Sequence, residues 1–200
     1  MSEFRRLLDE ALDGRYSVSL HQMGLMEQHY TLLMGWAGRV NLTSIRDPRK
    51  VVERHFCESI ALGAALPTGA LSIVDIGSGA GFPGIPLSVV RPECSVTLVE
   101  SDAKKAVFLR EASAGLSNVR VVRERADRIE DSFDWVVSRA VDWSEIRGVV
   151  VLLGRGVGLL TSPALAQSMH TDPAISWLPA VRLPWKGSGV IAMGTLSIAM

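Results

Sequence analysis

The chain has 200 residues, of which 48% are apolar and 21% charged. A chain of this size and composition buries enough surface to fold without disulfides or metals, so it is neither wholly disordered nor a disulfide-stapled mini-protein. Its 21 basic and 21 acidic side chains give a formal net charge of zero. That balance excludes a protein that holds nucleic acid by bulk electrostatics, although a local basic patch would still suffice for binding.

The cysteines and the apolar segments bear on the cellular compartment. Cys57 and Cys94 form neither a CxxC pair nor a zinc-ligand spacing, so we expect free thiols in a reducing cytoplasm and no metal site. The N-terminal segment lacks the apolar run of a signal peptide, and no stretch reaches the roughly 18 apolar residues of a membrane helix. We therefore expect a soluble, cytoplasmic monomer with no membrane partner.

Residues 1–66 are expected to form an N-terminal helical extension. Apolar residues repeat at helical spacing from Phe4 to Leu12, and Ser19 to Gln22 fits a capping box that opens a second helix extending to Ala37. Asp47-Pro48 is a cap followed by a first-turn proline, and it precedes an apolar stripe of Val52, Phe56 and Ile60. Three helices are thus predicted before the pattern changes at residue 71.

Residues 67–200 are expected to form an α/β domain, packed with the extension as one globular unit. The strands are predicted at 71–76, 95–100, 119–123, 133–138, 156–160, 176–183 and 190–198, and the helices at 103–115, 126–130 and 142–153. Alternation of strands and helices is typical of a doubly wound, Rossmann-like parallel sheet. We expect seven strands, mostly parallel, with the last two forming a hairpin.

A glycine-rich loop, residues 75–84, follows the first strand, and an acidic residue closes the second strand. Gly77 and Gly79 let the backbone turn tightly, and Glu100 lies where nucleotide-binding sheets place an acid that binds ribose hydroxyls. The spacing is G-x-G-x-G, and Phe82 occupies the place of the third glycine of a dinucleotide motif. This favours S-adenosylmethionine (AdoMet) as the ligand, with a dinucleotide or a purely structural turn as the alternatives.

Several segments in order resemble one known family. They are Asn41-Leu42-Thr43, Arg46-Asp47-Pro48, Arg54-His55, the loop from Asp75 through Gly84 to Leu87, Arg91-Pro92, Lys104-Lys105, Phe108-Leu109-Arg110 and Ser138-Arg139-Ala140. Together they resemble the bacterial small-subunit ribosomal RNA (guanine-N7) methyltransferases, the RsmG or GidB family, over about residues 35 to 145. The resemblance implies an AdoMet-dependent methyltransferase with a helical N-terminal extension and small-subunit ribosomal RNA, or the ribosomal particle, as its partner.

Carried over residue by residue, the resemblance implies the cofactor contacts. Gly77 and Phe82 would contact AdoMet from the first loop, Ala126 and Asp127 would contact the adenine, and Arg139 would contribute from the end of the fourth strand. The chain departs from the family pattern at Ser162-Pro163, where Lys-Gly is usual, and from Gly187 to Val190, where a basic residue is expected. The resemblance therefore gives no support to RNA contacts from the C-terminal part.

Two further groups of residues have a functional and a structural interpretation. His55, Glu58 and Ser59 share one face of the third predicted helix, which is either a polar edge of the core or, together with Arg139, a wall of the substrate site. A cluster of polar and basic residues flanks that helix: Arg39, Asn41, Arg46, Arg49, Lys50 and Arg54. The cluster is either a solvated face or a set of RNA contacts.

The implied reaction explains why no general base is evident. Guanine N7 has a free lone pair and loses no proton before it attacks, so catalysis would consist of alignment. The chain lacks the Asn/Asp-Pro-Pro-Tyr/Phe motif of adenine-amino methyltransferases, and it has no cysteine at a strand end for cytosine-C5 chemistry. The alternatives are AdoMet-dependent methylation of a small molecule or protein, a nicotinamide-dependent oxidoreductase and a non-catalytic RNA-binding module.

Overall fold

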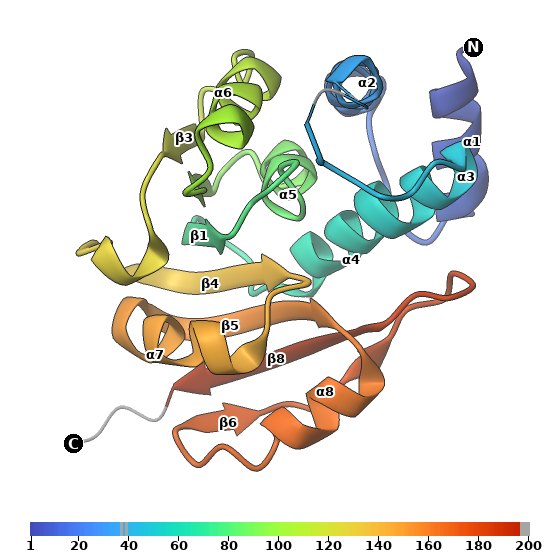
Figure 1. Ribbon diagram of the computed structural model, residues 1–200. Coiled ribbons are helices and arrows are strands. Elements are labelled where there is room, and N and C mark those ends of the chain that lie inside the picture. The colour runs from blue at the N-terminus through green and yellow to red at the C-terminus, as the bar shows by residue number, and fades with distance from the viewer. Residues whose placement is uncertain (37, 39, 197–200) are drawn as a thin grey trace.

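The computed structural model describes residues 1–36, 38 and 40–196, and it contains one mixed sheet. The strands are β1 (Ser72–Ile76), β2 (Ser95–Val99), β3 (Val119–Val122), β4 (Phe133–Arg139), β5 (Gly154–Thr161), β6 (Ile175–Trp177), β7 (Val181–Arg182) and β8 (Val190–Leu196). Their order is β3-β2-β1-β4-β5-β8-β6, with β7 also paired to β8. The first five strands are parallel and β8 is antiparallel to β5 (Figure 1), which confirms the doubly wound α/β class.

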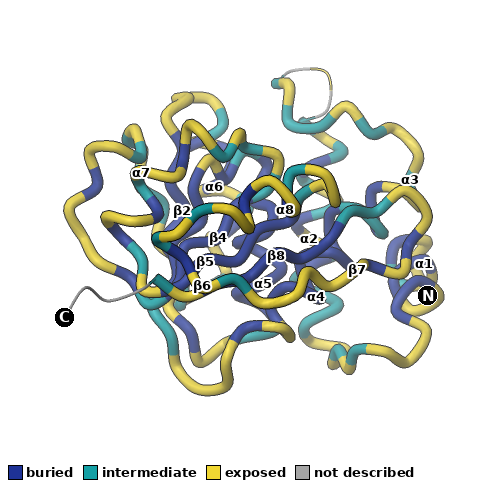
Figure 2. The backbone as a smooth tube through the Cα atoms, turned by 90° about the horizontal axis from the view of Figure 1, so that it is seen from below, coloured by how far each residue is buried: buried dark blue, intermediate teal, exposed yellow. Residues whose placement is uncertain are grey.

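Helices cover both faces of this sheet. They are α1 (Glu3–Leu12), α2 (Leu20–Trp36), α3 (Pro48–Val51), the π-helix η1 (Val52–Cys57), α4 (Glu58–Ala65), α5 (Gly84–Val90), α6 (Ala103–Ala112), the 3₁₀ turn η2 (Ala126–Arg128), α7 (Trp143–Leu153) and α8 (Pro163–Met169). Helices α1 to α6 pack on one face in a single hydrophobic cluster with the strands, whereas α7 and α8 pack on the other. Figure 2 shows the strands as a buried centre surrounded by exposed loops and helix surfaces.

Local sequence signals explain where the helices begin. The capping box is confirmed, because the Ser19 backbone N–H donates to Gln22 Oε1 at 2.8 Å and the Gln22 N–H donates to Ser19 Oγ at 3.2 Å. Asp47 and Asp142 accept from the first-turn N–H groups of α3 and α7.

Among the described residues, no helix has the length and apolar character needed to cross a bilayer.

Three features of the fold differ from the sequence expectations. The predicted sixth strand is divided into β6 and β7 by a segment that contains Pro179, which has no N–H to donate to a ladder, so the sheet has eight strands rather than seven. The predicted third helix is continuous but widens into a π turn at η1. Helix α8 was not expected, although Ser162 caps it and Pro163 occupies its first turn. The last two residues of the predicted final strand lie outside the described residues.

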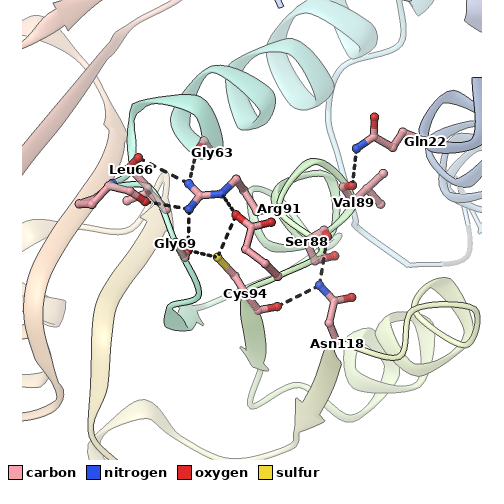
Figure 3. A network of polar contacts seen from close by, with 11 residues as sticks. Gln22, Gly63, Leu66, Gly69, Ser88, Val89, Arg91, Cys94 and Asn118 are labelled. Carbon is pink, nitrogen blue, oxygen red and sulfur yellow. Dashed lines mark hydrogen bonds and ion pairs between the residues drawn. The ribbon is translucent and has the colours of Figure 1, made fainter. Parts of the chain in front are cut away.

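A half-buried arginine joins the helical part to the sheet. Arg91, at the end of α5, donates from Nη1 to the Gly63 carbonyl oxygen at 2.9 Å and from Nη2 to those of Pro67 and Gly69 at 2.7 and 3.0 Å (Figure 3). These carbonyls belong to the end of α4 and to the connection that leads into β1. One guanidinium therefore fixes the path of the chain between the helices and the first strand.

This arrangement predicts a large effect of Arg91→Met on stability. The substitution leaves the backbone carbonyls of Gly63, Pro67 and Gly69 without their charged donor, and we expect the free energy of unfolding to fall by about 2–4 kcal/mol. Urea unfolding followed by circular dichroism measures it. The control is Glu93→Gln, which removes only the exposed half of the Arg91–Glu93 ion pair and should cost less than about 1 kcal/mol. Equal midpoints for Arg91→Met and the wild type would contradict the role.

Candidate functional site

The glycine loop lies at the carboxyl ends of β1 and β2, and Glu100 fixes its shape. Gly77, Gly79 and Gly81 all have positive φ, at 67°, 55° and 86°, where a side chain would be strained. The Gly79 N–H donates to Glu100 Oε2 at 3.0 Å, and the Asp102 N–H donates to Glu100 Oε1 at 2.8 Å. The buried carboxylate thus has a fixed orientation and retains lone pairs for further donors.

A cavity of about 480 Å³ opens beside this carboxylate. Its walls include Gly77, Glu100, Ala126, Asp127 and Val141, so the structure brings together four of the predicted cofactor residues. We call this candidate AdoMet site the cofactor cavity. A Cβ on Gly77 would approach the Val141 side chain to 3.1 Å, so the absence of a side chain at residue 77 keeps this floor open. The Glu100 carboxylate can accept hydrogen bonds from ribose hydroxyls, and Gly77 leaves its backbone accessible to a ligand. These groups suit the binding of AdoMet.

A second carboxylate supports the loop from beneath. Asp75 is fully buried, and its Oδ2 accepts from the Gly84 N–H at 3.0 Å. Burial raises the pKa of this carboxyl group to about 7. A Cβ on Gly84 would overlap both Asp75 and Leu98, so this glycine is required for the close approach of α5 to the sheet.

Phe82 lies between two histidines rather than on the cofactor cavity. Its ring stacks on His55 with a centroid distance of 4.6 Å and on His29 with one of 4.7 Å, and two rings at that distance must occupy opposite faces. His29, on α2, also bonds the Ala80 carbonyl oxygen at 2.8 Å. The side chain of Phe82 therefore anchors the glycine loop to the helical part, and only its backbone remains available to a ligand in the loop.

Five polar side chains form a continuous chain across the carboxyl ends of the strands. Arg139, the last residue of β4, is 2.9 Å from His55 Nδ1 through Nη1 and 3.3 Å from Glu58 Oε2 through Nε. The other Glu58 oxygen pairs with Arg54 Nε at 2.7 Å, and His55 Nε2 lies 2.8 Å from Thr43 Oγ1. Glu58 is 2% exposed, so this is a buried carboxylate shared by two guanidinium groups.

The hydrogen bonds assign the protonation of His55. Arginine has donors only, so Nδ1 of His55 accepts from Arg139, and Nε2 carries the hydrogen that it donates to Thr43. Burial, together with the smaller effect of the positive charge of Arg139, lowers the pKa of His55 to about 3. Burial also lowers the pKa of His29 to about 4. Both imidazoles are therefore neutral at physiological pH.

Arg139 separates two cavities outside the cofactor site. The first, of about 520 Å³, is lined by Arg54, Glu58, Arg139, the start of α8 and the 187–190 segment, and we call it the arginine cavity. Val141 lines both this cavity and the cofactor cavity. Ala140, on its wall, has φ of 58°, a strained value for a residue with a side chain. The second cavity, of about 640 Å³, is lined by residues 41–46 with His55 and Arg139.

Ser59 does not reach any of these cavities. It is fully buried, and its hydroxyl donates to the His55 carbonyl oxygen at 2.5 Å. Of the predicted wall, His55 and Arg139 are thus brought together and Ser59 supports the helix behind them. Within the described ranges, no group of three or more potential metal ligands gathers.

The residues of the basic cluster have different surroundings. Arg46 and Lys50 are exposed, whereas Arg49 pairs with Glu10 of α1 at 2.6 Å. Arg54 is held by Glu58 and also donates from Nη1 to the Gly187 carbonyl oxygen. Asn41 and Arg46 line the second cavity. Arg39 lies outside the described residues.

The contacts of three site residues were not evident from the sequence. His29 was hidden in an apolar helical stripe, and its partner Ala80 is 51 residues away. Glu58 was noted only for its position on the helix, and Thr43 only as part of a motif. A buried carboxylate needs a cationic partner, so the arginines at residues 54 and 139 were the available signal for Glu58.

The neutral histidines lead to a pH prediction. Nitrogen-15 NMR of the rings should show His29 and His55 in the neutral form from pH 8 down to pH 5, with the hydrogen of His55 on Nε2. Because the unfolded chain takes up protons near pH 6.5 and the folded site does not, each histidine should lower the stability by up to about 1.4 kcal/mol per pH unit below that value. Titration of either ring near pH 6.5 would contradict the assignment.

Comparison with known proteins places this site in a family. The family model described as "GidB: rRNA small subunit methyltransferase G" matches residues 22–154. The chain is 44% identical over 160 residues to ribosomal RNA small subunit methyltransferase G of Stenotrophomonas maltophilia strain K279a, covering 76% of this chain and 72% of that protein. It is 38% identical over 157 residues to the protein of the same name from Xanthomonas campestris pv. campestris strain 8004, with the same coverage.

Solved structures show the same fold at low sequence identity. The 23S rRNA methyltransferase ErmE superposes with a TM-score of 0.55 at 18% identity, covering 78% of this chain and 70% of that one. A SAM-dependent methyltransferase from Aquifex aeolicus gives a TM-score of 0.54 at 16% identity, with coverages of 75% and 93%. With a family model that matches most of its length and relatives at this level of identity, the chain belongs to the GidB family of small-subunit ribosomal RNA methyltransferases.

Proposed function

We propose that this protein transfers the methyl group of AdoMet to N7 of a guanine in small-subunit (16S) ribosomal RNA. One observation carries the proposal. At the carboxyl end of β4, the cavity with the glycine floor and Glu100 meets a cavity that holds two arginines, and Val141 lines both. A methyl donor in the first would be adjacent to an electron-rich base in the second, and the family of the chain supports this substrate.

The cofactor residues have separate tasks in this proposal. Glu100 accepts the ribose hydroxyls, the backbone at Gly77, Gly79 and Phe82 surrounds the methionine part, and Ala126 and Asp127 border the adenine. Arg139 does not line the cofactor cavity, so a contact with AdoMet would come from the side of the arginine cavity. AdoMet supplies an electrophilic methyl group on a positively charged sulfur.

The chemistry makes few demands on the protein. The N7 lone pair forms a bond to the methyl carbon while the carbon–sulfur bond breaks and its electron pair stays on sulfur, giving S-adenosylhomocysteine and a positively charged 7-methylguanine. No proton is lost, and neutral His55, with both ring nitrogens hydrogen-bonded, is not a proton acceptor. The site therefore acts by holding N7 about 3 Å from the methyl group and in line with sulfur.

The RNA side of the proposal uses the loop that precedes the third helix and the first turn of that helix. Asn41 and Arg46 line the second cavity, and Arg49 and Lys50 follow on α3. All four are exposed and would contact the backbone of an RNA whose target base is unstacked. Residues 1–66 act as an extension of the methyltransferase domain, residues 67–200. We propose that the protein works as a cytoplasmic monomer on the ribosomal particle or its RNA, without a metal.

The function is tested by methyl transfer to undermodified small subunits. Labelled AdoMet, the protein and small ribosomal subunits lacking native methylation should give label at N7 of one guanine, identified by nuclease digestion and mass spectrometry. Cells without the protein should lack that methyl group. Label in another base or in a ribosomal protein, or tight NAD binding with no AdoMet binding, would reject the proposal.

Glu100→Gln is expected to weaken AdoMet binding by about 10-fold or more. An amide accepts the ribose hydroxyls less strongly than a carboxylate, and it exchanges one acceptor oxygen for a donor that opposes either the Gly79 or the Asp102 N–H group. Isothermal titration calorimetry measures the Kd. Glu111→Gln, on the exposed side of α6, is the matched control and should leave the Kd unchanged. An unaltered Kd for Glu100→Gln would contradict the role of Glu100.

A further inference from the structure

The arginine cavity holds one guanidinium that is both fixed and accessible. Arg54 pairs through Nε with Glu58 and donates from Nη1 to the Gly187 carbonyl oxygen. Among the described residues, Nη2 has no hydrogen-bond partner, and the side chain is 33% exposed. The ion pair with Glu58 and the hydrogen bond to Gly187 hold the guanidinium on two sides, and Arg54 lines the cavity, so its third nitrogen remains available as a donor to a molecule bound there.

This guanidinium is poorly suited to hold a phosphate. The buried Glu58 carboxylate lies against it and offsets its charge, and the carbonyl at residue 187 already occupies a second nitrogen. A bidentate contact to phosphate needs two free N–H groups on the same edge of the planar guanidinium group. Arg46, on the loop before α3, and Lys50, on α3, are exposed, have no ion pair among the described residues and are better placed for that contact.

A single directed donor does suit the edge of the base that reacts. Guanine presents the acceptors N7 and O6 side by side, whereas adenine presents the acceptor N7 beside the donor N6 amino group. If N7 points across Val141 toward the cofactor cavity, O6 is the neighbouring atom on that edge. A guanidinium hydrogen-bonds O6 and opposes an amino group, because it has donors only.

We propose that Arg54 selects guanine by donating from Nη2 to O6 of the base that is methylated at N7. This inference rests on the proposed function and extends it to base specificity. Glu58 is then a positioning residue that orients Arg54, and Arg139 and Gly187 complete the support.

The test uses small subunits reconstituted with one of three bases at the nucleotide that the methylation assay identifies. The bases are guanine, inosine, which keeps O6 and N7, and 2-aminopurine, which keeps N7 and the amino group but has no O6. We expect the wild type to methylate inosine within a few-fold of guanine and 2-aminopurine about 10- to 100-fold more slowly. Equal rates on inosine and 2-aminopurine would overturn the inference without any variant.

The Arg54→Gln variant separates recognition from the intrinsic reactivity of each base. We expect kcat/KM to fall by about 10- to 100-fold on guanine and inosine and by less than about 3-fold on 2-aminopurine, because the base lacking O6 has no bond to lose. Differences in N7 nucleophilicity cancel, since the same three bases are compared in both proteins. The AdoMet Kd and the urea midpoint verify that the variant is folded, and Arg54→Lys is the second variant if it is not.

Arg46→Gln is the matched control for a phosphate contact. It should lower kcat/KM equally on all three bases and reduce the salt dependence of RNA binding by about one charge. If Arg54→Gln behaves in the same way, or changes no rate, Arg54 does not read O6. If the wild type methylates no guanine N7 in any particle, the proposed function itself has failed, whereas guanine methylation without discrimination against 2-aminopurine rejects only the role of Arg54.

Discussion

The site depends on the stacking of Phe82 between two uncharged imidazole rings. His29 comes from α2 and His55 from η1, and both rings lie within 5 Å of the Phe82 centroid. A charged imidazole would lose its hydration in this buried place without a carboxylate to compensate, so the stack requires both histidines to be neutral. The glycine loop therefore keeps its shape through contacts from the N-terminal helices, which are structurally part of the candidate cofactor site.

The same stack connects the cofactor loop to the arginine cavity. His55 contacts Phe82 with its ring face and Arg139 with Nδ1, and Arg139 in turn shares Glu58 with Arg54. Two guanidinium groups on one carboxylate leave a single surplus positive charge in a partly buried cavity, where salt screens it less than on the surface. The zero net charge of the chain is thus compatible with a local positive site, because only the charges next to the cavity act on a bound base.

Much of the fold could be predicted from the sequence because local signals determine it. Strand runs, the capping box and the positive-φ glycines act over a few residues, and their consequences appear where expected. The side-chain network could not be derived in this way, because Arg139 and Glu58 are 81 residues apart and meet only when β4 and the third helix are adjacent. Ser59 shows that a shared helix face does not imply a shared site. It lies on the same face as His55, but its hydroxyl donates to a backbone carbonyl oxygen and does not reach a cavity.

The π turn of η1 explains how two consecutive residues, His55 and Phe56, both contact the ring of Phe82. Phe56 meets the Phe82 ring edge-on at 5.1 Å, while His55 stacks on it at 4.6 Å. In a regular α-helix, successive side chains diverge by about 100°, which separates two consecutive residues onto different faces. The wider turn, closed by the hydrogen bond from the Glu58 N–H to the Glu53 carbonyl oxygen, reduces that divergence. No capping hydrogen bond from a side chain marks this turn. The π turn lets one short segment supply both the core residue Phe56 and the site residue His55, and both rings contact Phe82, which is distant in sequence.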